Sequence, residues 1–137
     1  MPTEHLRHAT LTWAHDLVFE GGALGGPRIV IDGDSAAGPS PMVALLLAAA
    51  GCTGSDLVSI LDKMRGGLTA CRIEVSGTRR PDHPKRYTDI RFVFHVSGSA
   101  LDNTKVRRAI DLSLEKYCSV VHSLAPDIVV TYDLVLS

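Results

Sequence analysis

Residues 40–67 carry the longest helical pattern in the chain, and this segment constrains the fold more than any other. Ser40 is a good N-cap, and Pro41 suits the first helical position, where a missing N–H costs nothing. Gly66 and Gly67 predict where the helix ends. Between these limits apolar residues recur at the spacing of a helix face, at Val43, Leu46, Leu47, Ala50, Leu57, Ile60, Leu61 and Met64.

The apolar residues of this helix occupy more than one stripe. Leu45, Ala48, Ala49 and Val58 lie off the main stripe, so the helix requires burial on several sides. One small sheet covers only one of those sides. We therefore predict a homodimer, in which a second copy of the chain supplies the missing cover.

Cys52 lies inside this helix, between Gly51 and Gly54. Each interior glycine costs about 1 kcal/mol of helix stability relative to alanine. Two explanations stay open: a backbone, side chain or ligand approaches Cys52 closely, or the glycines only allow tight helix packing. A second cysteine, Cys118, also lies in a helical setting far along the chain. Two such thiols suggest redox chemistry.

Length, charge and composition limit the classes of protein to consider. A chain of 137 residues is predicted to be a single domain, residues 1–137. The net charge is −1 and no basic run is present, so we expect no nucleic-acid or membrane partner. The longest apolar stretch, residues 42–51, is about half of what a bilayer span requires. The N-terminus lacks an apolar signal core, and three cysteines do not make a disulfide scaffold, which predicts a cytoplasmic location.

The rest of the chain reads as hairpins and one further helix, which is an α+β pattern. The glycine-rich turn 21–26 joins the first two strands. The second helix is predicted to begin at the N-cap Asp102 and to continue through Val121. Strands are predicted at residues 8–19, 27–32, 69–77, 87–96 and 128–136.

No other motif predicts a cofactor or a metal. Cys71 shares one strand face with Ile73 and Val75, where we expect it to act as a small buried apolar residue. Neither a Cys-x-x-Cys nor a His-Glu-x-x-His spacing is present, so we predict no metal and no cofactor. The serines are not set in a Gly-x-Ser-x-Gly elbow, and serine hydrolase chemistry has no support.

Five segments, in order and over nearly the whole chain, closely resemble the OsmC/Ohr family, the osmotically induced and organic-hydroperoxide-resistance proteins. These segments are residues 38–42, 45–48, 51–61, 83–88 and 109–120. The resemblance implies an α+β fold of the OsmC-like type, with antiparallel sheets wrapped around long central helices in an intertwined homodimer.

The resemblance also implies a thiol-dependent reductase of organic hydroperoxides. Cys52 is then the peroxidatic residue and Cys118 the resolving one, and a dithiol reductant, a lipoyl or thioredoxin-like protein, reduces their disulfide. Only a thiolate attacks a peroxide efficiently, and a resolving partner limits oxidation to irreversible acids. The candidates for an apolar lining around an organic substrate are Leu45, Leu46, Ala49 and Tyr117, although such residues more often belong only to the core.

Active family members pair an arginine with a glutamate to activate the thiolate, and this chain departs from that pattern. The arginine position aligns with Val18, and the glutamate position aligns with Met42 or Val43. Asp56, one turn after Cys52, would oppose a thiolate if close. The residues considered as replacements for the activating arginine and glutamate are His15, Arg28 and His122.

Two alternatives to a peroxidase therefore stay open. The first is a non-catalytic OsmC-like protein that binds a small apolar or electrophilic ligand near an unactivated Cys52. The second is a structural dimer with two buried, inert thiols, which predicts that neither cysteine reacts with alkylating agents in the native protein.

Overall fold

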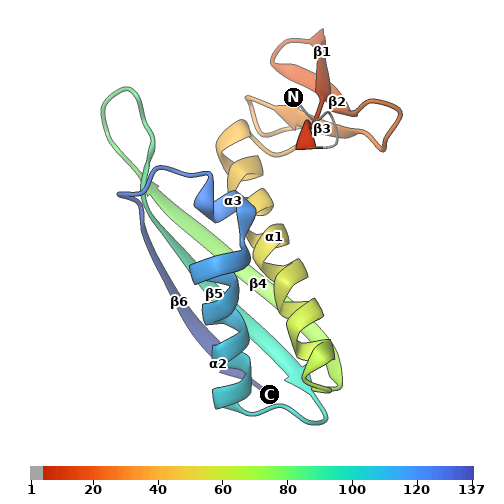
Figure 1. The fold of residues 1–137 in the computed structure, drawn as a ribbon. Coiled ribbons are helices and arrows are strands. Elements are labelled where there is room, and N and C mark those ends of the chain that lie inside the picture. The colour runs from red at the N-terminus through yellow and green to blue at the C-terminus, as the bar shows by residue number, and fades with distance from the viewer. Residues whose placement is uncertain (1–4) are drawn as a thin grey trace. The chain divides into compact units, whose positions relative to one another are not determined.

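A computed structural model describes residues 5–137 of the chain. It contains two small sheets and their connecting helices, in the order of elements shown in Figure 1. The chain divides into two compact units, Met1–Leu45 and Leu46–Ser137, and each is described by itself. The predicted α+β class is confirmed by the two sheets and the helices between them.

The first unit holds a three-stranded antiparallel sheet in the order β1-β2-β3. The prediction of one strand over residues 8–19 is wrong, because the chain turns at Asp16, whose φ of 47° is in the left-handed region. The turn between β2 and β3 includes Gly25, with φ of 72°. The strands are β1 (Ala9–His15), β2 (Val18–Ala23) and β3 (Ile29–Asp32).

A buried carboxylate shapes the loop that follows β3. Asp32 accepts hydrogen bonds from the backbone N–H groups of Ala37, Asp34 and Ala36. These bonds, that from Ala37 above all, hold the pKa of Asp32 below its usual value. These hydrogen bonds therefore fix the conformation of the first residues of the loop that leads to the long helix.

The second unit holds the larger sheet, in the order β4-β5-β6. Its strands are β4 (Leu68–Arg79), β5 (Tyr87–Gly98) and β6 (Val129–Leu136). β4 and β5 form the predicted antiparallel pair, but β6 runs parallel to β5, which the expectation of antiparallel sheets missed. The parallel register arises because the chain crosses over the sheet through helices before it returns.

The core of the second unit lies between this sheet and two helices. α1 (Pro41–Lys63) and α2 (Asn103–Leu112) lie on the same face of the sheet (Figure 1). The predicted alternation along β5 is confirmed, since its inward residues are at most 1% exposed and are followed by exposed or half-buried ones. The largest buried side chains of the core are Ile90, Phe92, Phe94, Val96, Leu57, Leu61, Val106 and Ile110.

α1 begins and ends close to the predicted positions. The Ser40 hydroxyl accepts a hydrogen bond from the Val43 N–H at 3.3 Å, which confirms the N-cap. At the other end Arg65, not a glycine, takes the left-handed conformation (φ of 55°), and the Gly66 N–H donates to the Leu61 carbonyl. The helix is therefore closed by a Schellman-like turn one residue before the predicted glycines.

The two glycines beside Cys52 have different explanations. A Cβ at Gly54 would lie 3.0 Å from the Ile73 side chain, so Gly54 allows the helix to pack tightly on the sheet. A Cβ at Gly51 would meet nothing within 4 Å, and nothing in the described residues explains this glycine.

α1 is also the one helix of the described residues that is long and apolar enough to cross a bilayer, by length and composition alone. A core helix passes the same test. In α1 Leu57, Leu61 and Ala49 are fully buried, but only 28% of its apolar window is buried within the described chain.

α2 has the predicted N-cap. The Asp102 carboxylate accepts a hydrogen bond from the Lys105 N–H at 2.7 Å. We expect Asp102→Ala to lower the free energy of unfolding by about 1 kcal/mol, because an orphan helical N–H loses its partner. Urea unfolding followed by circular dichroism measures the change. Asp102→Asn is the matched control and should stay within a few tenths of a kcal/mol of the parent; an equal loss in both variants would contradict the capping role.

The second helix does not continue to Val121 as predicted. It passes into a π-helical turn, η2 (Ser113–Tyr117), and breaks at Cys118, whose ψ of 97° is extended. A short helix, α3 (Ser119–His122), follows. The break leaves the Cys118 side chain fully buried in the second unit, and π-helical turns of this kind occur frequently at functional sites.

Candidate functional site

The structure brings Cys52, Asp56 and Cys118 together. The two sulfur atoms and a carboxylate oxygen of Asp56 all lie within 4.8 Å of one another. Cys52 and Asp56 share one face of α1 because they are four residues apart, and Cys118 reaches them from the helix break after η2. We refer to these three residues as the thiol cluster. Both cysteines are free thiols.

Cys118 is the buried member of the cluster. Its side chain is fully buried, and the Thr53 hydroxyl donates a hydrogen bond to its sulfur at 3.2 Å. Burial raises the pKa of the Cys118 thiol, while the hydrogen bond from Thr53 opposes that rise. Cys118 is therefore held as a neutral thiol in a fixed position.

Asp56 is held by a neutral partner. The fully buried Ser113 hydroxyl donates to its carboxylate at 2.8 Å. None of the ion pairs found among residues 5–137 includes Asp56. The cluster thus has an acidic side chain beside its thiols and hydroxyl groups around it.

The raised pKa of Cys118 predicts a pH dependence for its alkylation. The thiol keeps its proton to a higher pH than an ordinary cysteine, so native alkylation of Cys118 should reach its half-maximal rate at a higher pH than in the unfolded protein. Iodoacetamide rates measured in a Cys52→Ser, Cys71→Ser double variant test this expectation. The same variant in urea is the control, with a midpoint near the ordinary value. A native midpoint below the unfolded one would contradict it.

Cys52 is partly exposed, and an open groove lies beside the cluster. The groove has a volume of about 470 Å³, and Asp56 forms part of its wall. Of the predicted apolar lining residues, Tyr117 lines the groove, whereas Leu46 and Ala49 are buried core residues. The other lining residues are Ser59, Ile60, Lys63, Met64 and Leu112.

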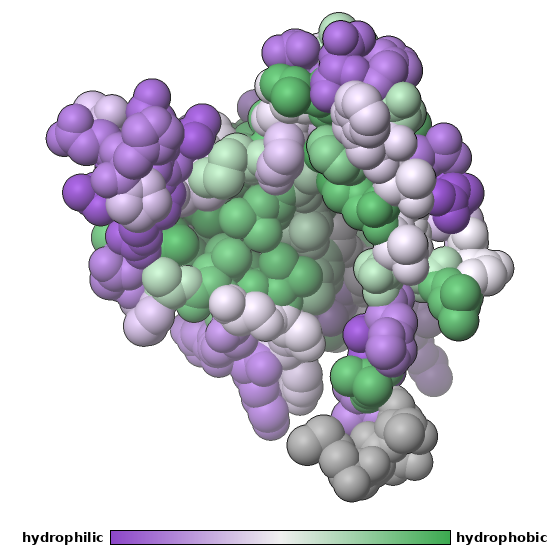
Figure 2. Space-filling view, turned by 90° about the horizontal axis from the view of Figure 1, so that it is seen from above, coloured by the Kyte–Doolittle hydropathy of each residue, from purple (hydrophilic) through white to green (hydrophobic). Residues whose placement is uncertain are grey.

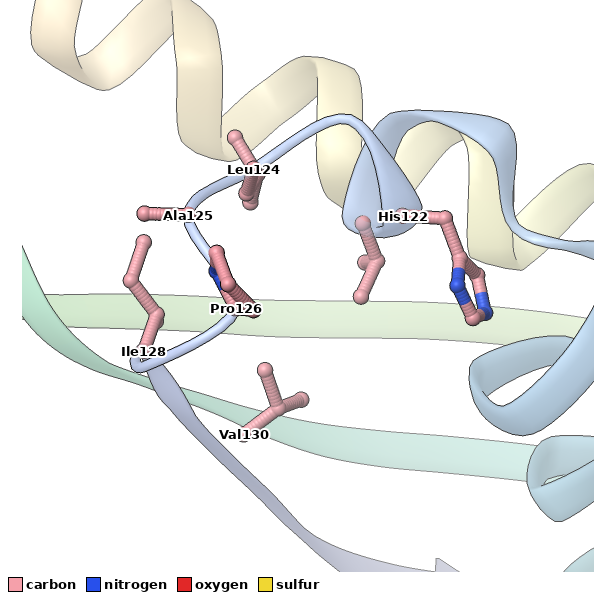
Figure 3. Close-up of a pocket in the computed structure, with 7 residues that line it drawn as sticks. His122, Leu124, Ala125, Pro126, Ile128 and Val130 are labelled. Atoms are coloured by element: carbon pink, nitrogen blue, oxygen red, sulfur yellow. The ribbon is translucent and has the colours of Figure 1, made fainter.

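A smaller hollow of about 270 Å³ lies between the end of α3 and the start of β6. Figure 3 shows the side chains of its lining, which are apolar except for the ring of His122. None of them is a cysteine or an acid. The lining residues are Val121, His122, Leu124, Ala125, Pro126, Ile128 and Val130.

The residues considered as substitutes for the activating pair all have other partners. His15 contacts Asp16 and Arg28 pairs with Glu20, both within the first unit. His122 is exposed, and its Nε2 lies 3.1 Å from a backbone carbonyl oxygen.

The first unit holds the other positions named for that pair. Val18 is buried within it, and Val43 is exposed. Cys71 is exposed, so the prediction that it is buried is wrong.

Thr53 and Ser113 are the residues that sequence reasoning missed. Thr53 follows Cys52 directly, and no spacing rule pairs it with a cysteine 65 residues away. Ser113 is fully buried in the second unit, and its bond to Asp56 depends on the π-helical turn. The signal by which sequence analysis could have found these residues is a polar residue in an otherwise apolar helix stripe.

Comparison with known proteins agrees with this fold. The model of the OsmC-like protein family matches residues 32–133. Protein YhfA of Escherichia coli (strain K12) is 40% identical over 125 residues, which cover 90% of this chain and 93% of that protein.

Two solved structures show the same fold. The OsmC-like protein of Mycoplasma pneumoniae has a TM-score of 0.84 and 16% identity, with 97% of this chain and 98% of that one covered. The organic hydroperoxide resistance protein OhrB of Bacillus subtilis has a TM-score of 0.65 and 15% identity, with 96% and 99% covered. With the family model matching about three-quarters of its length, this chain belongs to the OsmC-like protein family.

Proposed function

We propose that this protein reduces organic hydroperoxides with a pair of cysteines, Cys52 attacking the peroxide and Cys118 resolving the product. The observation that carries the proposal is the proximity of the two free thiols, whose sulfur atoms lie within 4.8 Å although 65 residues separate them in the chain. Membership of the OsmC-like family agrees with a redox role. The similarity to OhrB shows only a shared fold, so the proposal rests on the two thiols.

The division of roles follows from burial. The attacking thiol must meet a substrate from solution, and Cys52 is partly exposed, whereas Cys118 is fully buried. Burial also raises the pKa of Cys118, which disfavours the thiolate needed for attack. A buried thiol beside the attacking one is well placed to capture its oxidised product.

The reaction balances in three steps. The Cys52 thiolate attacks the outer peroxide oxygen, the S–O bond forms as the O–O bond breaks, and the departing alkoxide takes a proton to become an alcohol. The Cys118 sulfur then attacks the Cys52 sulfenic acid, and hydroxide leaves as water with the Cys118 proton. A dithiol supplies two electrons and two protons, which restore both thiols and leave the dithiol oxidised.

The local geometry supports the second step. A disulfide needs a sulfur separation of about 2.05 Å, so the two sulfurs must approach. The hydrogen bond from Thr53 holds the fully buried Cys118 sulfur, while the Cys52 side chain is less buried. Rotation of the Cys52 side chain is therefore the motion that closes the gap.

The groove beside Asp56 supports an organic substrate rather than hydrogen peroxide. Its wall includes Ile60, Met64, Leu112 and the ring of Tyr117. An alkyl or aryl group gains from leaving water for such a surface, by about 25 cal/mol for each Å² of apolar area buried. Hydrogen peroxide has no apolar group that could gain in this way.

The test is the rate at which the reduced protein, recycled by dihydrolipoamide, consumes cumene hydroperoxide and hydrogen peroxide. The proposal expects turnover with both and a kcat/KM for the organic substrate at least about 10-fold higher, the value of one or two buried methylene groups. No consumption of either peroxide above a Cys52→Ser control would contradict it.

One observation favours a second function, the non-catalytic binding of a small apolar ligand. The thiol cluster contains a carboxylate, whereas a cation is the group that stabilises a thiolate. The hollow in Figure 3 offers an apolar site without thiols. Binding of an apolar fluorescent probe that Val130→Arg abolishes, in a protein that consumes no peroxide, is the result that this function expects.

We also propose that two copies of the chain form a homodimer. Large apolar side chains are exposed in both units, including Trp13 (63%), Leu47 (54%) and Val58 (48%). Figure 2 shows a broad hydrophobic patch on one face of the molecule, and patches of this kind commonly mark association surfaces. A second copy over α1 would also enclose the open groove.

Light scattering tests the dimer at micromolar concentration. We expect a mass twice the 14.7 kDa of the chain, and Leu47→Asp should shift the population toward the monomer. Asp62→Asn, a substitution near the polar end of the same helix, is the control that should keep the dimer. A monodisperse monomer of the parent protein would contradict the proposal.

A further inference from the structure

The thiol cluster has the donor set of a metal site. Two cysteine sulfurs and one carboxylate oxygen converge within 4.8 Å of one another. Sequence spacing predicted no metal, because the ligands come from α1 and from the helix break more than 60 residues later. The absence of a short Cys-x-x-Cys motif therefore does not exclude a metal site whose ligands lie far apart in the chain.

We infer that the reduced thiol cluster binds one thiophilic divalent cation, of which Zn²⁺ is the type, through Cys52, Asp56 and Cys118. Thiolates select such ions over Mg²⁺ and Ca²⁺, which prefer all-oxygen ligands. Zn²⁺ displaces one proton from each thiol and is held by two thiolates and one carboxylate, with no change in oxidation state. This inference is independent of the proposed peroxide chemistry.

The spacing of the three ligand atoms fits tetrahedral coordination after a small contraction. Zn–S bonds of about 2.3 Å place neighbouring ligand atoms about 3.8 Å apart. The limit of 4.8 Å on the separations of these atoms leaves at most about 1 Å to close. Three protein ligands leave the fourth position open, and the partial exposure of Cys52 gives the ion a route of entry.

The neighbouring hydroxyl groups complete the argument. Thr53 donates to the Cys118 sulfur and Ser113 donates to Asp56, and both hydroxyl groups are fully buried. Hydrogen bonds to ligand atoms orient metal ligands, and their loss typically weakens metal affinity 10- to 100-fold. The site thus has both its ligands and the groups that orient them.

Bound metal and the disulfide exclude each other, because both use the same two sulfur atoms. Oxidation of the pair should release the ion, and the ion should protect the thiols from alkylation. Metal occupancy is therefore linked to the redox state of the cysteines.

The experiment is a zinc titration of the reduced, chelator-treated protein against a chromophoric competitor, with a phosphine reductant and no peroxide. We expect one Zn²⁺ for each chain. Cys118→Ser and Asp56→Asn should weaken binding by about 10-fold or more, since each removes a ligand. Cys71→Ser, which alters a thiol outside the cluster, should bind as the parent does. Zero stoichiometry, or equal affinity in Cys118→Ser, would overturn the inference.

Cobalt substitution keeps the inference testable if a variant fails to fold. Co²⁺ added to the unaltered reduced protein should produce thiolate-to-cobalt charge-transfer absorption in the near ultraviolet, and the preformed disulfide should abolish it. Absorption that survives in the disulfide form would overturn the inference. If the protein binds Zn²⁺ but consumes no peroxide, the metal site stands and the proposed function fails. If it consumes peroxide but binds no Zn²⁺, the proposed function stands and the metal site fails.

Discussion

Replacing Cys118 with alanine is expected to leave one round of peroxide reduction and to stop turnover. Cys52 still attacks, but its sulfenic acid has no thiol within reach, so intact mass should rise by one oxygen after one equivalent of cumene hydroperoxide. Excess peroxide should then carry Cys52 to the sulfinic acid, which a dithiol does not reduce. Steady-state consumption measured with dihydrolipoamide should fall by at least about 10³-fold, a loss of the size seen when a catalytic group is removed.

Two further variants separate this expectation from a general loss of structure. Cys52→Ser should lose even the first round, because no attacking thiolate remains. Cys71→Ser is the matched control, since Cys71 is an exposed free thiol outside the cluster, and it should turn over like the parent. Undiminished turnover in Cys118→Ala would show that Cys118 is not the resolving thiol.

Phe94→Ala is expected to cost about 3–5 kcal/mol of the free energy of unfolding, the usual range for a buried phenylalanine. Phe94 is fully buried, its ring centroid lies 5.6 Å from that of Phe92, and it meets the Tyr132 ring edge-on at 5.8 Å. Truncation removes both ring contacts and leaves a cavity between the sheet and the helices. Urea denaturation, monitored by circular dichroism, measures the loss.

Val93→Ala is the matched control on the same strand. Val93 points to the opposite side of β5 and is only partly buried, so its truncation should cost about 1 kcal/mol or less. Equal losses in the two variants would mean that the core does not lie on the helix-covered face of the sheet.

The elements with strong periodicity were predictable from the sequence. The alternation along β5 and the Ser40 cap of α1 follow from local patterns, and the structure confirms both. The split of the first strand at Asp16 was not predictable, because apolar residues continue on both sides of a turn made by a non-glycine residue. The parallel return of β6 depends on tertiary packing that no local pattern records.

The candidate site was predictable only in part. Cys52 and Cys118 were singled out by their helical settings, and the family resemblance supplied their roles. Asp56 was noted for its position one turn after Cys52. Thr53 and Ser113 were missed because their bonds depend on how α1 meets the π-helical turn before Cys118. A continuous helix in place of that turn would point the residues after it in other directions. The break at Cys118 depends on tertiary contacts, which local sequence patterns do not record.

Peptide mapping of the reduced protein after brief exposure to one equivalent of cumene hydroperoxide tests the central proposal most directly. The account predicts a loss of two hydrogens from the intact mass and a disulfide between Cys52 and Cys118, neither of which forms in a Cys52→Ser variant. An unchanged mass with unconsumed peroxide would contradict it.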